Sequence, residues 1–274
     1  MKDFVSVVEE HYYRPNLYDD ILNRLKEQGI DLNKVTRANI AGVDEFHVRG
    51  AAVSKELARA INLQSANVLD VGCGLGGPCR MLADEFNCQT TGIDLSEEFI
   101  KTATGLSKLV GLAERTKFVK GDATDLPFED QMFDAVWTQH VQMNIADKSS
   151  FYSEINRVLV DGGHFIYYDI FKSGDGNVDY PMPWASEAKI SFLAPISDMQ
   201  TILESLSLTK RQTTDETQNG IYFFEKLLQK IEKDGPPKLG LNVLMGESTK
   251  LKLGNLLRGL QDGHLVLQSG VYAK

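Results

Sequence analysis

The sequence predicts an α/β fold built on a doubly wound parallel sheet, and two observations carry this prediction. Between residues 66 and 171, short apolar runs of the β type alternate with longer segments in which apolar side chains recur at helical spacing. A turn with the spacing G-x-G-x-x-G follows the first run, at Gly72, Gly74 and Gly77. Because parallel strands are joined by crossover helices, the alternation predicts helices on both faces of the sheet.

Five apolar runs are predicted to be strands. They span residues 67–71, 90–94, 117–122, 133–138 and 164–169. The intervening segments carry apolar side chains three or four residues apart, which is typical of helices that bury one face. Ser96 and the two acids after it are predicted to cap the second of these helices, and Gly162-Gly163 is predicted to end the third.

Segments on both sides of this region have helical patterns, followed by one terminal strand. The predicted helices span residues 17–28, 53–61, 198–206, 216–233 and 248–260, and the strand spans 264–272. The stretch 42–50 is predicted to be a turn-rich connection. We interpret residues 1–50 as a helical N-terminal cap and residues 51–274 as the main domain. The helices at about 216–260 then form an insertion before the last strand.

The composition excludes several classes of function. No apolar run is long enough to cross a membrane, and Met1–Phe4 lacks the start of a secretion signal, so we expect a cytoplasmic protein. A net charge of −9 without a basic cluster argues against a nucleic-acid partner. Cys73, Cys79 and Cys88 are expected to be reduced, buried thiols, and no spacing indicates a metal site. We therefore expect a small-molecule partner and a monomer or homodimer.

Acidic side chains follow the predicted strands at the edge where doubly wound folds bind ligands. The five strands end at or beside Asp70, Asp94, Asp122, Thr138 and Asp169. One acid after a strand is an ordinary solvated loop residue. Four carboxylates at one edge of the sheet favour a binding site.

The glycine turn alone fits nicotinamide or flavin dinucleotides as well as other nucleosides, but charge separates these ligands. A dinucleotide brings a pyrophosphate to the turn, and Asp70 lies two residues before the first glycine. S-adenosylmethionine has no phosphate, and its ammonium and sulfonium are cations. Asp94 is then expected to accept the ribose hydroxyls and Asp122 the adenine amino group. The expected cofactor-binding set is Asp70, Gly72, Cys73, Gly74, Asp94, Leu95, Asp122, Ala123, Thr138 and Gln139.

An ordered set of motifs strengthens this interpretation. The segments at 70–77, 92–96, 121–128 and 133–137 resemble the successive signature motifs of class I S-adenosylmethionine-dependent methyltransferases of the small-molecule type. The segment at 154–163 resembles the helix before the fifth strand in that family. The resemblance covers about residues 51–171. It implies a Rossmann-like, mostly parallel sheet of seven strands whose last strand is antiparallel.

A narrower resemblance concerns the reaction centre. Residues 137–148, the loop that contains His47 and the helical insertion are similar to sarcosine/dimethylglycine N-methyltransferases and, more distantly, to phosphoethanolamine methyltransferases. Those relatives typically have an Asp where this chain has His140 and a His where it has Asn144. The resemblance implies methyl transfer to a small amine.

Methyl transfer from a sulfonium is an in-line displacement that depends on positioning the acceptor and removing its proton. His140, just after the fourth strand, is the first candidate for the catalytic base, and its alternative role is to pack beneath the cofactor. Asn144 lies four residues on, so a helical turn would place both side chains on one face. Asn144 then holds a substrate group or makes a loop hydrogen bond.

Five further residues are candidates for binding the substrate, each with a packing role as the alternative. His47 and Arg49 are placed to close over a carboxylate of the cofactor or substrate. Tyr12 and Tyr13 are suited to cover a cationic amine. Trp184 lies in a long loop that bounds the pocket or only forms a turn.

Several functions stay open on the sequence alone. Within methyl transfer, the alternative to an amine is an oxygen or carbon atom of an apolar acceptor such as a quinone or sterol. An NAD-dependent oxidoreductase depends on the glycine pattern alone, and a catalytically silent nucleoside-binding protein remains an alternative. A nucleic-acid methylase is disfavoured, because Thr138–Val141 replaces the Asn/Asp-Pro-Pro-aromatic motif of base-flipping amino-methylases.

Overall fold

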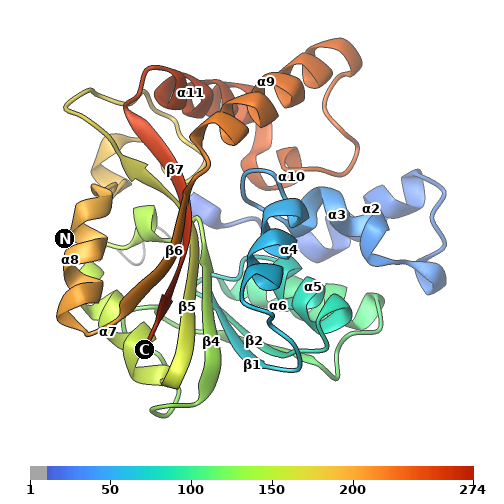
Figure 1. Cartoon of the computed structure of the whole chain (residues 1–274). Coiled ribbons are helices and arrows are strands. Elements are labelled where there is room, and N and C mark those ends of the chain that lie inside the picture. The colour runs from blue at the N-terminus through green and yellow to red at the C-terminus, as the bar shows by residue number, and fades with distance from the viewer. Residues whose placement is uncertain (1–10) are drawn as a thin grey trace.

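One seven-stranded sheet forms the centre of the computed structural model, which describes residues 11–274 and so leaves Met1–Phe4 outside the described residues. The strand order is β3-β2-β1-β4-β5-β7-β6 (Figure 1). Strands β1 to β5 are parallel, and β7 is antiparallel to both neighbours. The strands are β1 (Asn67–Val71), β2 (Gln89–Asp94), β3 (Thr116–Lys120), β4 (Phe133–Gln139), β5 (Leu159–Lys172), β6 (Thr209–Asp215) and β7 (Leu265–Ala273). The prediction of a mostly parallel sheet with an antiparallel last strand is confirmed.

Helices cover both faces of the sheet, as the alternation of strands and helices predicts. The described helices are α2 (Leu17–Glu27), α3 (Arg37–Asp44), α4 (Ala51–Ala60), α5 (Gly77–Glu85), α6 (Glu97–Leu109), α7 (Lys148–Val158), α8 (Ile196–Ser205), α9 (Thr217–Asp234), α10 (Asn242–Met245) and α11 (Thr249–Gln261). On one face, α4 and α5 pack against Val68 and Trp137; on the other, α7 and α8 pack against Leu69 and Val136. Successive side chains of β1 and β4 therefore point to opposite faces of the sheet and pack into two separate cores.

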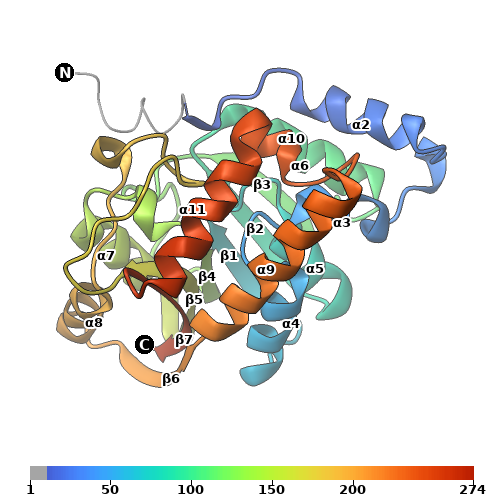
Figure 2. The same ribbon diagram turned by 90° about the horizontal axis from the view of Figure 1, so that it is seen from above.

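The insertion before the last strand is present and packs into the same core as α4 and α5. Helices α9 and α11 lie side by side above one end of the sheet, with α10 between them in the chain (Figure 2). None of the helices in the described residues is long and apolar enough to cross a membrane.

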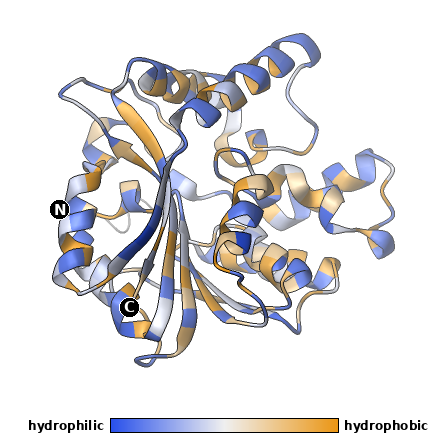
Figure 3. Ribbon diagram, in the orientation of Figure 1, coloured by the Kyte–Doolittle hydropathy of each residue, from blue (hydrophilic) through white to orange (hydrophobic). Residues whose placement is uncertain are grey.

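Three features differ from the sequence prediction. Strand β6 was missed because all seven of its residues are exposed, and it is the most hydrophilic strand of the sheet (Figure 3). Helix α3 was missed because its last three residues fall in the stretch 42–50, which was predicted to be turns. Gly162-Gly163 does not end the third helix: α7 stops at Val158, and the glycines lie where β5 changes register against β4.

A buried ion pair ties the N-terminal helices to the glycine turn. Arg80 of α5 is fully buried and binds the Asp44 carboxylate at the end of α3, the carbonyl of Leu75 and, at 3.2 Å, the hydroxyl of Ser107. The two helices meet so closely that a Cβ on Gly77 would lie 1.9 Å from the Asp44 carbonyl oxygen. The end of α3 is thus fixed against the first turn of α5.

Candidate active site

A cavity of about 290 Å³ lies beyond the carboxyl ends of β1, β2 and β4, where the sequence places the ligand. The glycine turn forms its floor, the turns after β2 and β3 form one wall, and the segment after β4 forms another. Residues 44–47, at the end of α3 and directly after it, lie against the turn. The cavity lining includes Tyr12, Asp44, Phe46, His47, Asp70, Gly72, Cys73, Gly74, Leu75, Asp94, Leu95, Phe99, Asp122, Ala123, Gln139, His140, Val141, Asn144, Ile145 and Asp147.

The glycine turn adopts a backbone that side chains would obstruct. Gly72 has φ +73°, and a Cβ on it would lie 2.5 Å from the Val141 side chain. The amides of Gly72 and Cys73 donate to the Ile93 carbonyl at 2.8 and 3.0 Å, which fixes the turn against β2. The amide of Gly74 donates to the Asp94 carboxylate at 2.9 Å. The turn therefore offers a ligand a bare backbone surface beside two carboxylates.

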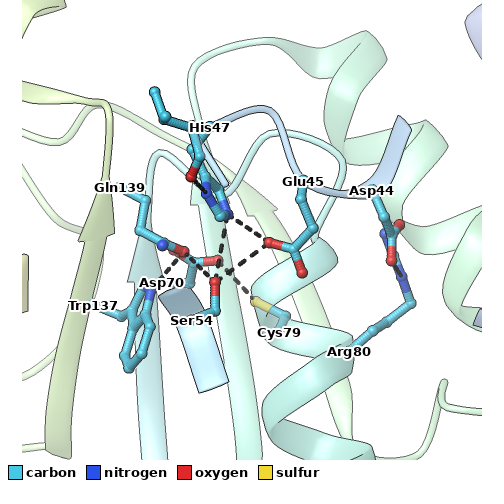
Figure 4. A network of polar contacts seen from close by, with 10 residues as sticks. Asp44, Glu45, His47, Ser54, Asp70, Cys79, Arg80, Trp137 and Gln139 are labelled. Carbon is cyan, nitrogen blue, oxygen red and sulfur yellow. Dashed lines mark hydrogen bonds and ion pairs between the residues drawn. The ribbon is translucent and has the colours of Figure 1, made fainter. Parts of the chain in front are cut away.

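Asp70 is a buried carboxyl group at the end of β1. Its one hydrogen bond in the described structure comes from the Cys79 thiol, at 3.4 Å (Figure 4). Burial raises the pKa of Asp70 to about 7 because the charged form loses its hydration. A ligand that brings a cation to Asp70 would compensate for that lost hydration.

Asp94 and Asp122 are held in place by backbone amides. The amides of Gly74 and Ser96 each donate to Asp94 at 2.9 Å, and its pKa is still raised, chiefly by burial. The amide and hydroxyl of Thr124 both donate to one oxygen of Asp122, at 2.8 Å. Each carboxylate thus has a fixed orientation toward the cavity.

The charges that line the cavity have one sign. Five aspartates line it, namely Asp44, Asp70, Asp94, Asp122 and Asp147, and no lysine or arginine does so within residues 11–274. Arg80 neutralises Asp44, but the other four have no basic side chain beside them in the lining. A pyrophosphate would be repelled here, whereas a cationic nucleoside would be attracted.

Asp169 does not join the other three predicted aspartates around the cavity, so the expectation of four carboxylates there is wrong for this residue. It is buried within β5, and its oxygens accept hydrogen bonds from the amides of Val141, Gln142 and Ile170. Burial raises its pKa to about 7. Asp169 is not part of the cavity lining, and it shapes the loop after β4 instead.

A network of buried polar groups fixes the amide of Gln139 (Figure 4). Its Oε1 accepts from Nε1 of Trp137 at 2.9 Å and from the hydroxyl of Ser54 at 3.2 Å. Because two donors meet this atom, the amide orientation is determined, and Nε2 is left buried without a protein partner. Gln139 therefore holds unused N–H donors at the cavity wall.

His47 belongs to the same network through Glu45. Its Nε2 lies 2.5 Å from the Glu45 carboxylate, and Nδ1 lies 3.3 Å from the carbonyl of Val48. Both ring nitrogens of His47 thus have protein partners. This arrangement suits a positioning role more than proton transfer.

His140 is the side chain best placed to act as a base. It follows β4 in the left-handed region, with φ +55°, and its Nε2 is buried without a partner. Burial, with a smaller effect of His47, holds its pKa well below the usual value. The imidazole is neutral at physiological pH and can accept a proton or a hydrogen bond from a ligand.

Tyr12 and Asn144 form a second polar pair at the cavity. The Tyr12 hydroxyl donates to the Asn144 side chain at 3.0 Å, and the Asn144 amide donates to the Trp184 carbonyl at 3.0 Å. Burial raises the pKa of Tyr12 well above its usual value, so the phenol stays protonated. The pair holds the N-terminal segment over the loop after β4.

Four residues named from the sequence lie outside this cavity. Thr138 is buried in β4 between Val71 and Tyr167 of the neighbouring strands, and Tyr13 is 59% exposed. Arg49 is occupied by ion pairs to two glutamates. The Trp184 side chain is buried, with its Nε1 bound to Ser191, and only its backbone reaches Asn144. The side chains of these four residues therefore do not line the cavity.

Other lining residues were missed by the sequence analysis. Phe46 and Phe99 supply apolar walls, and Asp44 contributes a further carboxylate. Glu45 and Ser54 do not line this cavity, but they contact residues that do: Glu45 binds the His47 ring, and Ser54 donates to the Gln139 side chain. The one available signal was the presence of three polar side chains, Asp44, Glu45 and His47, a few residues before the helix predicted at 53–61.

Comparison with known proteins identifies the central region. Residues 69–167 match the methyltransferase domain family. Norajmaline N-methyltransferase of Rauvolfia serpentina is 33% identical over 178 residues, which are 60% of this chain and 59% of that protein. The chloroplastic tocopherol O-methyltransferase of Arabidopsis thaliana is 42% identical over 99 residues, 36% of this chain and 28% of that protein. The matches thus span less than two thirds of either relative, and N-, O- and C-methyltransferases all occur among the relatives.

The fold has close counterparts among solved structures. A structure from Galdieria sulphuraria, named as a sarcosine dimethylglycine methyltransferase, superposes with a TM-score of 0.69 at 18% identity. The superposition covers 94% of this chain and 98% of that chain. The likeness confirms the class I methyltransferase fold that the sequence motifs predict.

Proposed function

Because residues 69–167 of this chain belong to the methyltransferase domain family, we propose that the protein transfers a methyl group from S-adenosylmethionine to a small-molecule amine. The observation that carries the proposal is the cavity beside the glycine turn, with five aspartates and no lysine or arginine among its described lining residues. When bound, S-adenosylmethionine supplies a methyl group activated by a cationic sulfonium.

The cavity residues fit this cofactor. Asp70 would pair with its ammonium group, Asp94 would accept hydrogen bonds from its ribose hydroxyls, and Asp122 would accept one from its adenine amino group. Gln139 adds a buried donor without a protein partner, suited to a carboxylate oxygen. The bare backbone at Gly72 and Gly74 admits a nucleoside without a side-chain clash.

The acceptor is attracted as a cation and must react as a neutral amine. Once the cofactor ammonium is paired with Asp70, the carboxylates of Asp94, Asp122 and Asp147 still leave the cavity anionic and attract an ammonium group. The neutral His140 can then accept a hydrogen bond and, after it, the proton at its Nε2. A lowered pKa makes His140 a weak resting base, so its first contribution is to orient the nitrogen lone pair. Removal of water by Phe46, Phe99 and Ile145 then strengthens these interactions.

Sarcosine and dimethylglycine are candidate acceptors because of the resemblance around residues 137–148. Both carry a carboxylate, and the described lining offers no lysine or arginine for it. We therefore favour amines without an acidic group.

A second candidate is methyl transfer to oxygen or carbon of an apolar acceptor, such as a quinone or sterol. The apolar side chains of Phe46, Phe99 and Ile145 in the lining favour it. The tocopherol O-methyltransferase among the relatives supports the same alternative.

The test is release of adenosylhomocysteine from S-adenosylmethionine in the presence of three acceptor panels: amines, amino acids, and phenols or quinols. The proposal predicts product with amines. Product with phenols or quinols alone would favour the second candidate. Binding of adenosylhomocysteine without turnover of any acceptor would indicate a silent nucleoside-binding protein, and binding of NAD in its place would indicate an oxidoreductase.

A further inference from the structure

A second cavity lies beside the first and is about three times larger, at about 870 Å³ compared with about 290 Å³. It is enclosed by the segment from α3 to α4, by α9, and by the chain from Pro236 through the start of α11. Figure 2 shows α9 and α11 spread over this side of the molecule. None of the residues predicted from the sequence to bind substrate, other than His47 and Arg49, lines it.

Apolar side chains form the inner wall of this second cavity. Phe223, Leu227 and Ile231 recur every four residues along α9, so they form one stripe that faces the cavity. All three are half-buried. Five further apolar residues also line the cavity: Pro236, Pro237, Leu239, Leu241 and Leu253. Much of the lining is therefore apolar, which suits an apolar ligand.

The basic side chains around the second cavity are already paired with acids. Arg24 binds Asp20 at 3.0 Å, and Lys250 faces Glu232 at 4.0 Å. Arg49 binds Glu56 at 2.8 Å and the buried Glu216 at 2.9 Å. A carboxylate or phosphate on the ligand would therefore have to break an existing ion pair to find a cation.

The two cavities meet at His47, which lines both. Glu45 lines the second cavity and binds the His47 ring. The His47 ring lies edge-on to the His140 ring, with 6.1 Å between their centroids. One imidazole therefore separates the apolar cavity from the unpartnered nitrogen of His140.

We infer that the acceptor is a bulky apolar amine without a carboxylate or phosphate, whose apolar body occupies the second cavity while its nitrogen reaches His140 past His47. This inference rests on the proposed function and narrows it to one class of substrate. The anionic first cavity attracts the ammonium end, and the apolar second cavity accepts the uncharged end. A small amino acid such as dimethylglycine would leave most of the second cavity unfilled and its own carboxylate unpaired.

The test is a direct binding measurement by calorimetry, in the presence of saturating adenosylhomocysteine. The probes are 4-phenylbutylamine, 4-phenylbutyrate with the same body but the opposite charge, and dimethylglycine. We expect the Kd of 4-phenylbutylamine to be at least about tenfold lower than that of either other probe, a difference of about 1.4 kcal/mol. Equal or tighter binding of dimethylglycine would overturn the inference.

Variants locate the binding site. Leu227→Trp places a larger side chain in the second cavity and should weaken 4-phenylbutylamine binding about tenfold, while the Kd of adenosylhomocysteine changes less than about twofold. Leu251→Trp is the matched control, because Leu251 is 54% exposed and does not line the cavity; both affinities should stay unchanged. If Leu227→Trp does not fold, as judged by circular dichroism, Ile231→Trp replaces it.

The outcomes separate this inference from the proposed function. Unchanged amine binding in a folded Leu227→Trp or Ile231→Trp protein would overturn the inference, even if methyl transfer occurs. Failure of adenosylhomocysteine to bind the wild-type protein would overturn the proposed function. Amine binding that is still sensitive to Leu227→Trp would then support the second cavity as a binding site by itself.

Discussion

The titration of Asp70 gives the most specific prediction for cofactor binding. Burial raises its pKa from 3.8 to about 7, a change of about three units or 4 kcal/mol. About one tenth of the Asp70 carboxyl groups are then ionised at pH 6 and about nine tenths at pH 8. If the ionised form binds the ammonium of adenosylhomocysteine, its affinity should rise about tenfold between these pH values.

Calorimetric titrations at several pH values between 6 and 8 test this prediction. In Asp70→Asn the affinity should be lower and independent of pH over this range. 5′-Methylthioadenosine is the matched ligand, because it lacks the ammonium group, and its affinity for the wild-type protein should stay flat. A pH dependence that persists in Asp70→Asn, or that 5′-methylthioadenosine shares, would refute the assignment of Asp70.

The same pKa shift has a consequence for stability. Because the folded state holds the Asp70 proton more tightly than the unfolded state, Asp70 costs stability as the pH rises from about 4 to about 7. Asp70→Asn should therefore be more stable than the wild type at pH 8, by up to about 4 kcal/mol, and gain nothing below pH 4. Chemical denaturation at both pH values measures this difference, and an equal effect at the two would contradict the shift.

Three further predictions concern the glycine turn and the base. Arg80→Met should cost about 3–5 kcal/mol of unfolding free energy by urea denaturation, because Asp44 would keep a buried, unpaired charge; Arg258→Met, which breaks an exposed pair, should cost about 1 kcal/mol or less. Gly77→Ala should lower the melting temperature and weaken adenosylhomocysteine binding, because the added Cβ would lie 1.9 Å from the Asp44 carbonyl oxygen. An unchanged melting temperature and an unchanged Kd would show that α3 can move away without cost. His140→Asn should lower kcat/KM at least about a hundredfold with little change in the cofactor Kd; asparagine is chosen because it tolerates the positive φ of this position. Normal turnover by this variant would show that His140 is not the base.

The central part of the fold could be predicted because its signals are local. The five parallel strands are apolar runs, and Ser96 caps α6 through the amide of Phe99 as its sequence pattern indicates. β6 gave no such signal: it is an exposed edge strand of Thr, Lys, Arg, Gln and Asp, and its pairing with β7 is decided by the sheet rather than by its own residues. Gly162-Gly163 was misinterpreted because a glycine pair marks a register change in a strand as well as a helix end.

The site residues that lie at the ends of strands could be predicted from the sequence. Those that reach the site through contacts between distant segments of the chain were missed. Asp70, Asp94 and Asp122 line the cavity because each lies at or beside the end of a parallel strand. Asp169 also lies near the end of a strand, but backbone amides of the loop after β4 occupy its oxygens. The contact of Glu45 with His47 depends on how residues 44–47 fold across the turn, which no single-residue pattern reveals.

The central claim is that the acidic cavity at the glycine turn accepts a cationic nucleoside and rejects a pyrophosphate. Calorimetric titration of one protein preparation with adenosylhomocysteine and with NAD tests it most directly. Saturable binding of adenosylhomocysteine with no heat from NAD is the predicted result. Binding of NAD, with adenosylhomocysteine unable to compete, would contradict it.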